Sequence, residues 1–312
     1  MRDITIEDSF ICYNWFPLVA DHCMDQSSVN FAGCGVSRLH NYDHLDPKEV
    51  EYGDIVFVNI YYLKNGHFQE HVLPQIENRF ILVSGIGGYQ IGSFGDKSYM
   101  KILESPNLIK WFCTNPPNVK SDKIIPLPIG FQERERAGGN QKLIEEIFNN
   151  KCEFAKKKDK ILLPYHRDTN PNRQKVFEAL SALPFVETCS QRLPWEDYMK
   201  LLNEYKFTIC LEGIAPDVHR NYECLLVNSI PINIKNIIEG LFKYHKLPGI
   251  FFVSWANLTE NSFKESYKND YNFNNVEKFL KIKYHAGLIK KSQREAIDSL
   301  PLIVGGGPKS DI

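Results

Sequence analysis

The sequence predicts an α/β fold in two halves, each built on a mostly parallel sheet with helices on its faces. The chain has 312 residues, which is enough for about two domains of ordinary size. Short apolar runs alternate with longer amphipathic segments, as in parallel sheets covered by helices. A charge-dense segment at 132–160 interrupts this alternation once. We therefore expect a first domain over residues 1–150, a second over residues 151–312, and a ligand cleft between them.

The first half is expected to contain four buried strands, because four short runs are apolar and rich in β-branched residues. Helical patterns connect these runs. The strands are expected at 54–61, 80–84, 109–113 and 123–130, and the helices at 66–77 and 97–104. The sequence before residue 52 holds an aromatic-rich run, Phe10–Leu18, and is otherwise irregular and polar.

The second half repeats the alternation after a segment that we interpret as a linker. Residues 132–160 are dense in charge and contain Gly138-Gly139, and both features favour a connecting segment. Strands are then expected at 160–164, 185–189, 206–211, 229–233 and 250–253. Helices are expected at 171–182, 194–205, 217–227, 235–244, 257–269 and 274–299. The last of these helices is a candidate to pack back on the first domain.

Composition and charge exclude several classes of protein. Apolar residues make up 43% of the chain and the formal net charge is -1, which excludes a disordered chain and a strongly basic nucleic-acid binder. No run of 18 apolar residues occurs, and the first residues show no signal segment. The eight cysteines include no C-x-x-C pair, which favours reduced, buried thiols. We therefore expect a soluble cytoplasmic protein without a membrane span.

Two short motifs point to other chemistries. Residues 67–71 match the H-x-x-E-H pattern of a zinc protease, but Pro74 would end that helix early and no third ligand follows. Gly85 and Gly87 follow a predicted strand, as in dinucleotide-binding enzymes, but Gln90 stands where a third glycine belongs. We expect no bound metal and keep a nicotinamide-dependent oxidoreductase as an alternative.

The most informative segment joins a buried strand to the start of a helix. Gly213 and Pro216 form the turn, and Asp217 stands where a helix N-cap is expected. Asp217, Arg220 and Glu223 are spaced by three residues, which places them along one helical face. A helix N-terminus with an arginine one turn in suits a diphosphate, and a later carboxylate can accept hydrogen bonds from a ribose. The alternative is an ordinary capped helix with an ion-pair ladder along that face.

The pattern E-G-x-x-x-D-x-H-R-x-Y-E-x-L-L-x-x-S-I-P-I at 212–232 resembles the signature of exostosin-like glycosyltransferases. The segments that agree with it are 171–173, 195–198 and, more loosely, 80–84, 111–115 and 126–130. The resemblance extends over residues 54–256. It implies the glycosyltransferase-B architecture, in which two Rossmann-like domains face each other across a cleft. It also implies an inverting, metal-independent transfer, with the acceptor bound mainly by the first domain and the sugar nucleotide by the second.

The resemblance implies a donor site in the second half of the chain. The residues carried over to this site are Arg173, Glu212, Gly213, Asp217, His219, Arg220 and Glu223. Arg173 and Arg220 would hold the diphosphate, and Glu223 would bind the ribose. The other two acidic residues and His219 would face the donor sugar or its phosphates. Fixed arginines and a helix dipole would stabilise the charge that develops on the leaving diphosphate.

The base that removes the proton of the acceptor hydroxyl is expected in the first half, facing the cleft. Proteins that this chain resembles often carry an aspartate in the loop after the strand at 80–84, and here Gly88 stands near that position. Asp96, later in the same loop, is the candidate that we prefer. The rival candidates are His71, Asp43 and Asp54.

These observations favour an inverting glycosyltransferase that moves a sugar from a nucleotide sugar, expected to be a UDP-sugar, to a hydroxyl of a glycan acceptor. No cofactor beyond this donor is expected. One alternative is a GDP-sugar transferase of the fucosyl type. Another is an inactive homologue that only binds carbohydrate or nucleotide, which the glycine at the expected aspartate position favours. Animal and plant exostosins have an N-terminal membrane anchor, which this sequence lacks.

Overall fold

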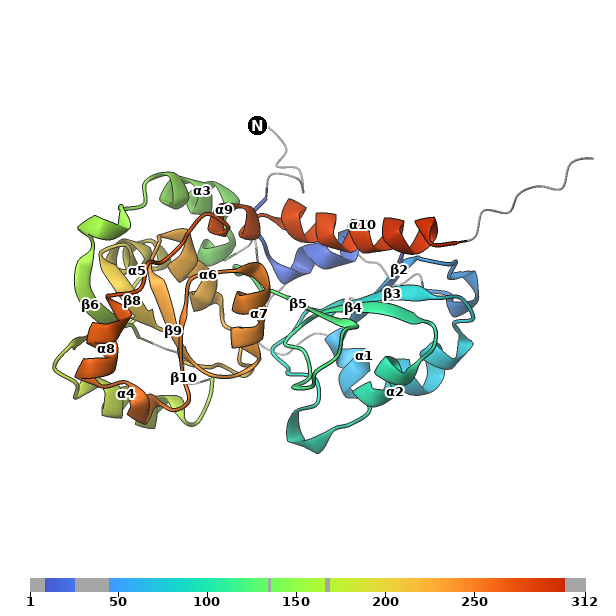
Figure 1. The fold of residues 1–312 in the computed structure, drawn as a ribbon, viewed down its shortest axis with the longest axis horizontal. Helices are drawn as coiled ribbons and strands as arrows, with labels where there is room; N and C mark the ends of the chain where they lie inside the picture. Colours follow the sequence, from blue (N-terminus) through green and yellow to red (C-terminus); the bar gives the residue numbers. More distant parts are fainter. Residues whose placement is uncertain (1–8, 26–44, 134–135, 166–168, 301–312) are drawn as a thin grey trace, which may run out of the picture.

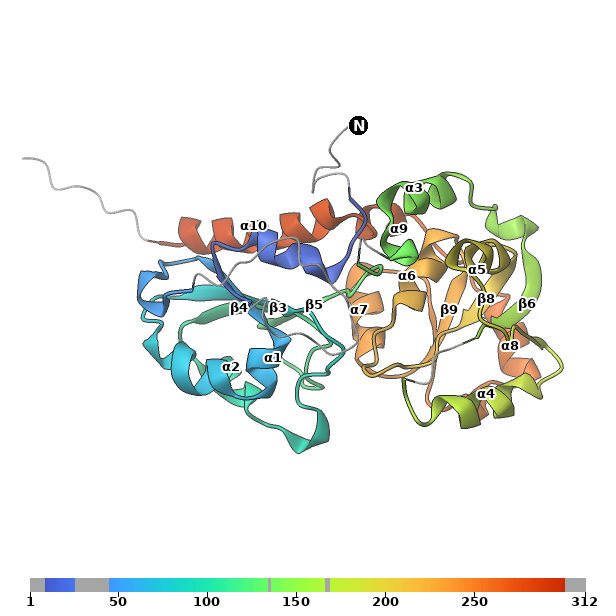
Figure 2. The same cartoon turned by 180° about the vertical axis from the view of Figure 1, so that it is seen from behind.

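The computed structural model describes residues 9–25, 45–133, 136–165 and 169–300, and Figures 1 and 2 show it from two sides. Within these residues the chain forms two parallel five-stranded sheets with helices packed on them. The predicted α/β class, with one parallel sheet in each half, is therefore confirmed.

Consecutive strands of the first sheet lie next to each other, and all of them are parallel. These strands are β1 (His22–Met24), β2 (Ile55–Asn59), β3 (Phe80–Gly85), β4 (Leu108–Thr114) and β5 (Ile124–Leu127). The last four are the strands expected from the sequence. The sequence does not predict β1, because its three residues are too few to show a periodic pattern.

The two faces of the first sheet are covered by different parts of the chain. Right-handed crossovers between sequential neighbours all return on the same side of a parallel sheet. That side packs against α1 (Ile60–Lys64), the π-helix η4 (Phe68–Val72) and α2 (Tyr99–Glu104). The opposite face packs against the 3-10 helix η2 (Tyr13–Val19) and against α10 (Ile282–Asp298). Figure 1 shows α10 and the blue η2 above the sheet, with α1 and α2 below it.

The second sheet has the order β7-β6-β8-β9-β10, again with all strands parallel. Its strands are β6 (Lys158–Leu163), β7 (Val186–Thr188), β8 (Tyr205–Ile209), β9 (Ile230–Ile234) and β10 (Ile250–Phe252). The chain adds β7 on one side of β6 and then continues on the other side with β8. This reversal creates a topological switch point between β6 and β8, where open α/β sheets bind ligands at the carboxyl ends of their strands.

Helices cover both faces of the second sheet. They are α4 (Arg173–Ser181), α5 (Trp195–Leu202), α6 (His219–Leu226), α7 (Ile237–His245) and α8 (Glu260–Ser266). Leu180 of α4 and Phe263 of α8 join one apolar cluster with Phe207 of β8. Residues of α5, α6 and α7 join the cluster on the other face. The crossover that leads into β7 and those that lead away from it therefore use opposite faces, as the strand order requires.

The segment at 132–160 is not the plain linker that its charge suggests. It contains α3 (Gln141–Asn149), which begins at Asn140, whose side chain accepts a hydrogen bond from the backbone nitrogen of Leu143 at 3.3 Å. Ile144 is buried and α3 packs against α6, while the charged residues lie on the outer face of the helix. Part of the charge that indicated a linker, on Lys142, Glu145 and Glu146, is therefore the exposed side of an amphipathic helix.

The two halves share one apolar core at their junction. Residues before η2 pair with the segment between α9 (Val276–Phe279) and α10, where the backbone nitrogen of Ile11 donates to the oxygen of Leu280 at 2.7 Å. From there α10 leaves the second half and runs along η2 of the first half (Figure 2). Near its end, Gln293 donates a hydrogen bond to Asp21 at 2.7 Å. The N-terminal segment and α10 thus tie the halves together.

Two further findings concern membrane segments and thiols. No helix in the described part of the chain is long and apolar enough to cross a membrane. Free thiols in the described segments include Cys113, Cys152, Cys189, Cys210 and Cys224, in agreement with the expectation from the sequence. Cys113, Cys210 and Cys224 are buried, and the other two are partly buried.

Candidate functional site

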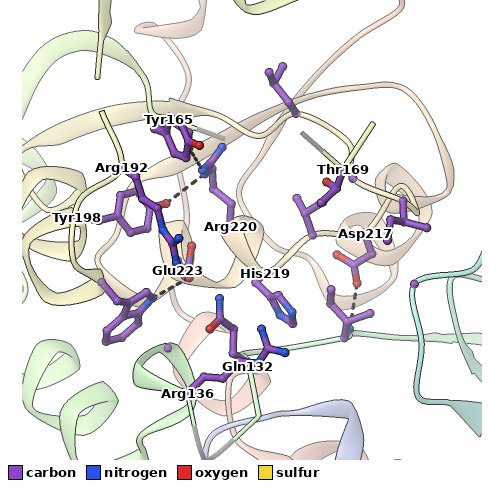
Figure 3. A pocket seen from close by; sticks show the side chains of 18 of the residues that line it. Gln132, Arg136, Tyr165, Thr169, Arg192, Tyr198, Asp217, His219, Arg220 and Glu223 are labelled. Atoms are coloured by element: carbon purple, nitrogen blue, oxygen red, sulfur yellow. Dashed lines mark hydrogen bonds between the residues drawn. The ribbon is translucent and has the colours of Figure 1, made fainter. Parts of the chain in front are cut away.

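A cavity of about 1040 Å³ lies where the carboxyl edges of the two sheets meet. It is lined from the loops that follow β3, β4 and β5 in the first half and β6, β7 and β8 in the second. Its charged and polar lining residues include Tyr13, Asn115, Gln132, Arg136, Tyr165, Thr169, Arg173, Gln191, Arg192, Tyr198, Asp217, His219, Arg220 and Glu223. Figure 3 shows several of these side chains pointing into the same space. The cavity includes the switch point of the second sheet, which is the expected ligand position.

Asp217 does not cap α6, contrary to the sequence-based expectation, because the helix begins two residues later and its N-cap is Val218. Its side chain is 4% exposed and accepts hydrogen bonds from the backbone nitrogen of Ile129, at 3.0 Å, and from the hydroxyl of Tyr222. Its backbone nitrogen donates to the side-chain oxygen of Asn115 at 3.0 Å. Burial raises the pKa of Asp217 to about 6, against the effect of these hydrogen bonds. Asp217 therefore joins two loops of the first half to α6.

Arg220 lies in the first turn of α6 and is held by two tyrosines. Its Nη2 donates to the backbone oxygen of Tyr165 at 2.6 Å, and its Nε donates to the hydroxyl of Tyr198 at 3.2 Å. The guanidinium carbon lies 5.7 Å from the centre of the Tyr198 ring. Among the described residues no ion pair joins Arg220 to a carboxylate. Arg220 is therefore a fixed cation at the cavity, held by neutral hydrogen-bond partners in the described part of the chain.

Glu223 follows one turn later and is 5% exposed. Its Oε1 accepts a hydrogen bond from the indole nitrogen of Trp195 at 2.9 Å. A Cβ atom on Gly138 would lie 2.9 Å from the same indole nitrogen, so this position in the loop needs a glycine. The ion-pair ladder considered as an alternative is not formed along this face, since Asp217 and Glu223 bind other partners.

Arg173 begins α4 and fixes the carboxyl end of β8. Its Nη2 donates to the backbone oxygen of Leu211 at 2.8 Å, and its Nε donates to that of Glu212 at 2.6 Å. Its Nη1 donates to the hydroxyl of Thr169 at 2.9 Å. A Cβ atom on Gly213 would lie 3.3 Å from Nη2, so the glycine permits this close approach. Arg173 lines the cavity and also links the two strands of the switch point.

One predicted donor residue points elsewhere. Glu212 is not among the residues that line the cavity, and its Oε1 accepts a hydrogen bond from the side chain of Asn236 at 2.6 Å. Asn236 caps the start of α7. The other six predicted donor residues all line the cavity, so the structure brings them together.

His219 is the first residue of α6, and its ring contacts the first half. Its Nδ1 lies 2.7 Å from the backbone oxygen of Gly130. Its ring stacks on Tyr13, with centroids 6.4 Å apart and planes at 23°. Tyr13 donates a hydrogen bond to Glu133 at 2.7 Å, and Arg136 forms an ion pair with the same carboxylate at 2.9 Å. This cluster closes the side of the cavity between the two halves.

The three predicted catalytic bases that lie within the described residues do not line the cavity. The Oδ1 of Asp96 accepts a hydrogen bond from the backbone nitrogen of Ser98 at 2.8 Å, just before α2. Asp54 precedes β2, at the opposite edge of the sheet, and lies 2.9 Å from the ring of a histidine. His71 is exposed on η4, and Asp43 lies outside the described residues. None of the described candidates is therefore placed to touch a ligand in the cavity.

The two motifs that suggested other chemistries, the histidine pattern at 67–71 and the glycines after β3, both lie in the first half. The rings of His67 and His71 lie 5.1 Å apart, but no group of three potential ligands for a metal occurs among the described residues. Gly87 adopts a φ of 138°. A Cβ atom on Gly88 would lie 3.4 Å from Ile214 of the other half. Gly88 therefore allows the halves to approach each other at the rim of the cavity, whereas Gly87 allows the loop to lie close to Ile60 of its own half.

Sequence reasoning missed two cationic residues of the cavity, Arg136 and Arg192. With Arg173 and Arg220 they make four of the ten arginines in the chain, whereas no lysine is among the described lining residues. The scarcity of arginine was the only signal available, because neither position belongs to a motif. Arginine presents a planar fork of donors that fits phosphate oxygens better than an ammonium group does.

No family model matches the sequence, and no curated protein matches it either. The cavity and the residue pattern at 212–232 are therefore the observations that bear on function. Both involve the same helix, α6, and the same turn before it.

Proposed function

We propose that the protein is an inverting glycosyltransferase of the glycosyltransferase-B architecture, which transfers a sugar from a UDP-sugar to a hydroxyl of a glycan. The observation that carries this proposal is the cavity lined by four arginines at the switch point of the second sheet. The cavity is large enough for a nucleotide sugar, because ligand sites commonly have volumes of about 300–1000 Å³.

The arginines of the cavity support the proposal that it binds a diphosphate. Arg220 donates to two tyrosines through Nε and Nη2, which leaves its Nη1 available to a ligand within the described part of the cavity. Arg192 lies on the loop after β7, on the same cavity. Charge develops on the leaving diphosphate during transfer, and donors that are fixed in advance stabilise it without reorganisation. Arg220 and Arg192 would bind the phosphates, while Arg173 would mainly hold the loop that surrounds them.

Glu223 supports the ribose as the neighbouring group. Trp195 occupies one of its carboxylate oxygens, so the second oxygen can accept a hydrogen bond from a ribose hydroxyl. The distance along α6 from Arg220 to Glu223 is one helical turn, about 5 Å. A ribose and its diphosphate are neighbours on that length scale.

A catalytically inactive nucleotide- or carbohydrate-binding protein is the second candidate. It is favoured by one observation, namely that Asp96 does not line the cavity and that glycine occupies position 88. A transferase that prefers a GDP-sugar would use the same arginines, and only the contacts to the base would differ.

Binding and turnover distinguish these candidates. Titration calorimetry with UDP and GDP measures the affinity of the wild-type protein and of Arg220→Ala. We expect the substitution to weaken binding by about 10- to 100-fold, since it removes charge-assisted hydrogen bonds. Arg79→Ala is the matched control, because Arg79 is exposed and does not line the cavity. Equal affinity of Arg220→Ala and wild type would contradict the proposed site. Binding without release of nucleoside diphosphate from any sugar donor would favour the inactive candidate.

A further inference from the structure

The hydrogen bond from His219 to the first half fixes which ring nitrogen carries a proton. A carbonyl oxygen only accepts hydrogen bonds, so the contact of 2.7 Å to Gly130 requires a proton on Nδ1. In the neutral ring Nε2 is then an acceptor with a lone pair. Stacking on Tyr13 holds the plane of the ring. Both the tautomer and the orientation of His219 are therefore set before any ligand binds.

The acceptor nitrogen of His219 is available at the cavity. Among the described residues Nε2 has no hydrogen-bond partner, and His219 is one of the lining side chains in Figure 3. Among the described lining residues the carboxylates are those of Asp217 and Glu223. Asp217 already accepts hydrogen bonds on both oxygens, and Glu223 accepts one from Trp195. Within the described part of the cavity lining, His219 is thus a residue whose basic atom is both oriented and unoccupied.

We propose that His219 is the general base of the transfer reaction, an inference that rests on the function proposed above. Nε2 removes the proton of the acceptor hydroxyl while that oxygen forms a bond to the anomeric carbon of the donor sugar. The bond from this carbon to the diphosphate oxygen breaks, and the nucleoside diphosphate leaves with the electron pair. The proton stays on Nε2 until it passes to water. The arginines of the cavity stabilise the charge on the departing diphosphate.

Charged groups of both halves surround His219. Burial raises the pKa of Glu133, but the hydrogen bond from Tyr13 and the charges of Arg136 and His219 outweigh burial and hold this pKa below its usual value. The carboxylates of Glu133 and Asp217 both interact with His219 electrostatically, and Arg136 forms an ion pair with Glu133.

His219→Asn separates a catalytic role from a structural one. The amide nitrogen of asparagine can take the place of Nδ1 and still donate to the Gly130 oxygen, but asparagine offers no base. We expect kcat to fall by about 100-fold or more. The affinity for UDP and the free energy of unfolding should remain close to those of the wild type. The fall of kcat/KM at acid pH, which reports protonation of an imidazole, should disappear in the variant.

Each outcome bears on a different claim. If His219→Asn keeps kcat within about tenfold of the wild type, the assignment of the base is overturned while donor binding stands. If the variant does not fold, the pH profile of the wild type decides, because a flat kcat/KM where imidazoles titrate excludes a histidine base. If the wild type binds neither UDP nor GDP, the proposed function itself is overturned, and the base with it.

Discussion

Acidification should destabilise the protein through two buried histidines at the junction of its halves. His285 of α10 is fully buried, and its Nε2 lies 2.7 Å from the backbone oxygen of Phe279. His245 of α7 is 3% exposed and contacts the hydroxyl of Tyr284 at 3.2 Å. Burial lowers the pKa of His245 to about 4 and, with the nearby His245, that of His285 to about 3.

Whether acid stabilises or destabilises the protein depends on whether the folded or the unfolded state binds protons at the higher pH. Unfolded histidines bind a proton below about pH 6.5, whereas the folded pair stays neutral until about pH 4 or 3. Stability is therefore complete above pH 6.5 and is lost as the pH falls towards 4. At pH 5 each histidine removes about 2 kcal/mol, because each unit of pH in this range costs about 1.4 kcal/mol. Asp217 opposes them by about 1 kcal/mol, since its raised pKa lets the folded state bind a proton first.

Urea unfolding at pH 7.5 and pH 5 measures these contributions in the wild type and in His285→Phe. At pH 7.5 the variant should lose about 1–3 kcal/mol, because the oxygen of Phe279 loses its donor. Between the two pH values, however, its stability should fall by about 2 kcal/mol less than that of the wild type. His71→Phe, the same change at an exposed histidine, should keep the full pH dependence. An unchanged pH dependence in His285→Phe would refute the assignment.

Three further substitutions test the geometry of the site. Asp217→Asn should remove the stabilisation of about 1 kcal/mol that Asp217 contributes at pH 5, measured by the same urea unfolding. A pH dependence equal to that of the wild type would show that this carboxylate does not titrate in that range. Arg173→Lys keeps the charge but loses the paired hydrogen bonds to the backbone oxygens of Leu211 and Glu212. The free energy of unfolding should therefore fall by about 2 kcal/mol, and UDP should bind more weakly. Wild-type values in both assays would contradict the role of Arg173 in holding this loop. Gly130→Ala would place a Cβ atom 2.2 Å from a backbone oxygen, whereas at Gly95 nothing lies within 4 Å. Thermal unfolding should therefore show a far larger loss for Gly130→Ala than for Gly95→Ala, although both have positive φ, and equal losses would argue against the close approach.

The fold could be predicted where the local pattern and the tertiary environment agree. Strands β2 and β3 are buried along their whole length, so their sequences contain continuous apolar runs that a search for periodicity detects. The sequence pattern did not reveal two elements, β1 and α3. β1 is too short to show a pattern, and α3 places its charges outward, so that a single helical face was hidden in a charge-rich segment.

The site could be predicted where residues share one element. The face of α6 with Arg220 and Glu223 follows from helical spacing alone, and both residues line the cavity. Arg136 and Tyr13 come from segments of the first half that meet α6 only because the sheets pack edge to edge. Sequence spacing carries no information about such contacts. The same limit explains why Asp96 was preferred as the base, although its side chain binds the backbone nitrogen of Ser98, just before α2, and does not line the cavity.

The most direct test of the proposed function is the release of nucleoside diphosphate from UDP-sugars and GDP-sugars, measured with a panel of glycan acceptors. The wild type should release UDP from at least one UDP-sugar in a manner that depends on the acceptor. Arg220→Ala should lose this activity, and Arg79→Ala should retain it. Full activity of Arg220→Ala would contradict a donor diphosphate held by the arginines of this cavity, and no release from any donor by the wild type would contradict the transferase activity itself.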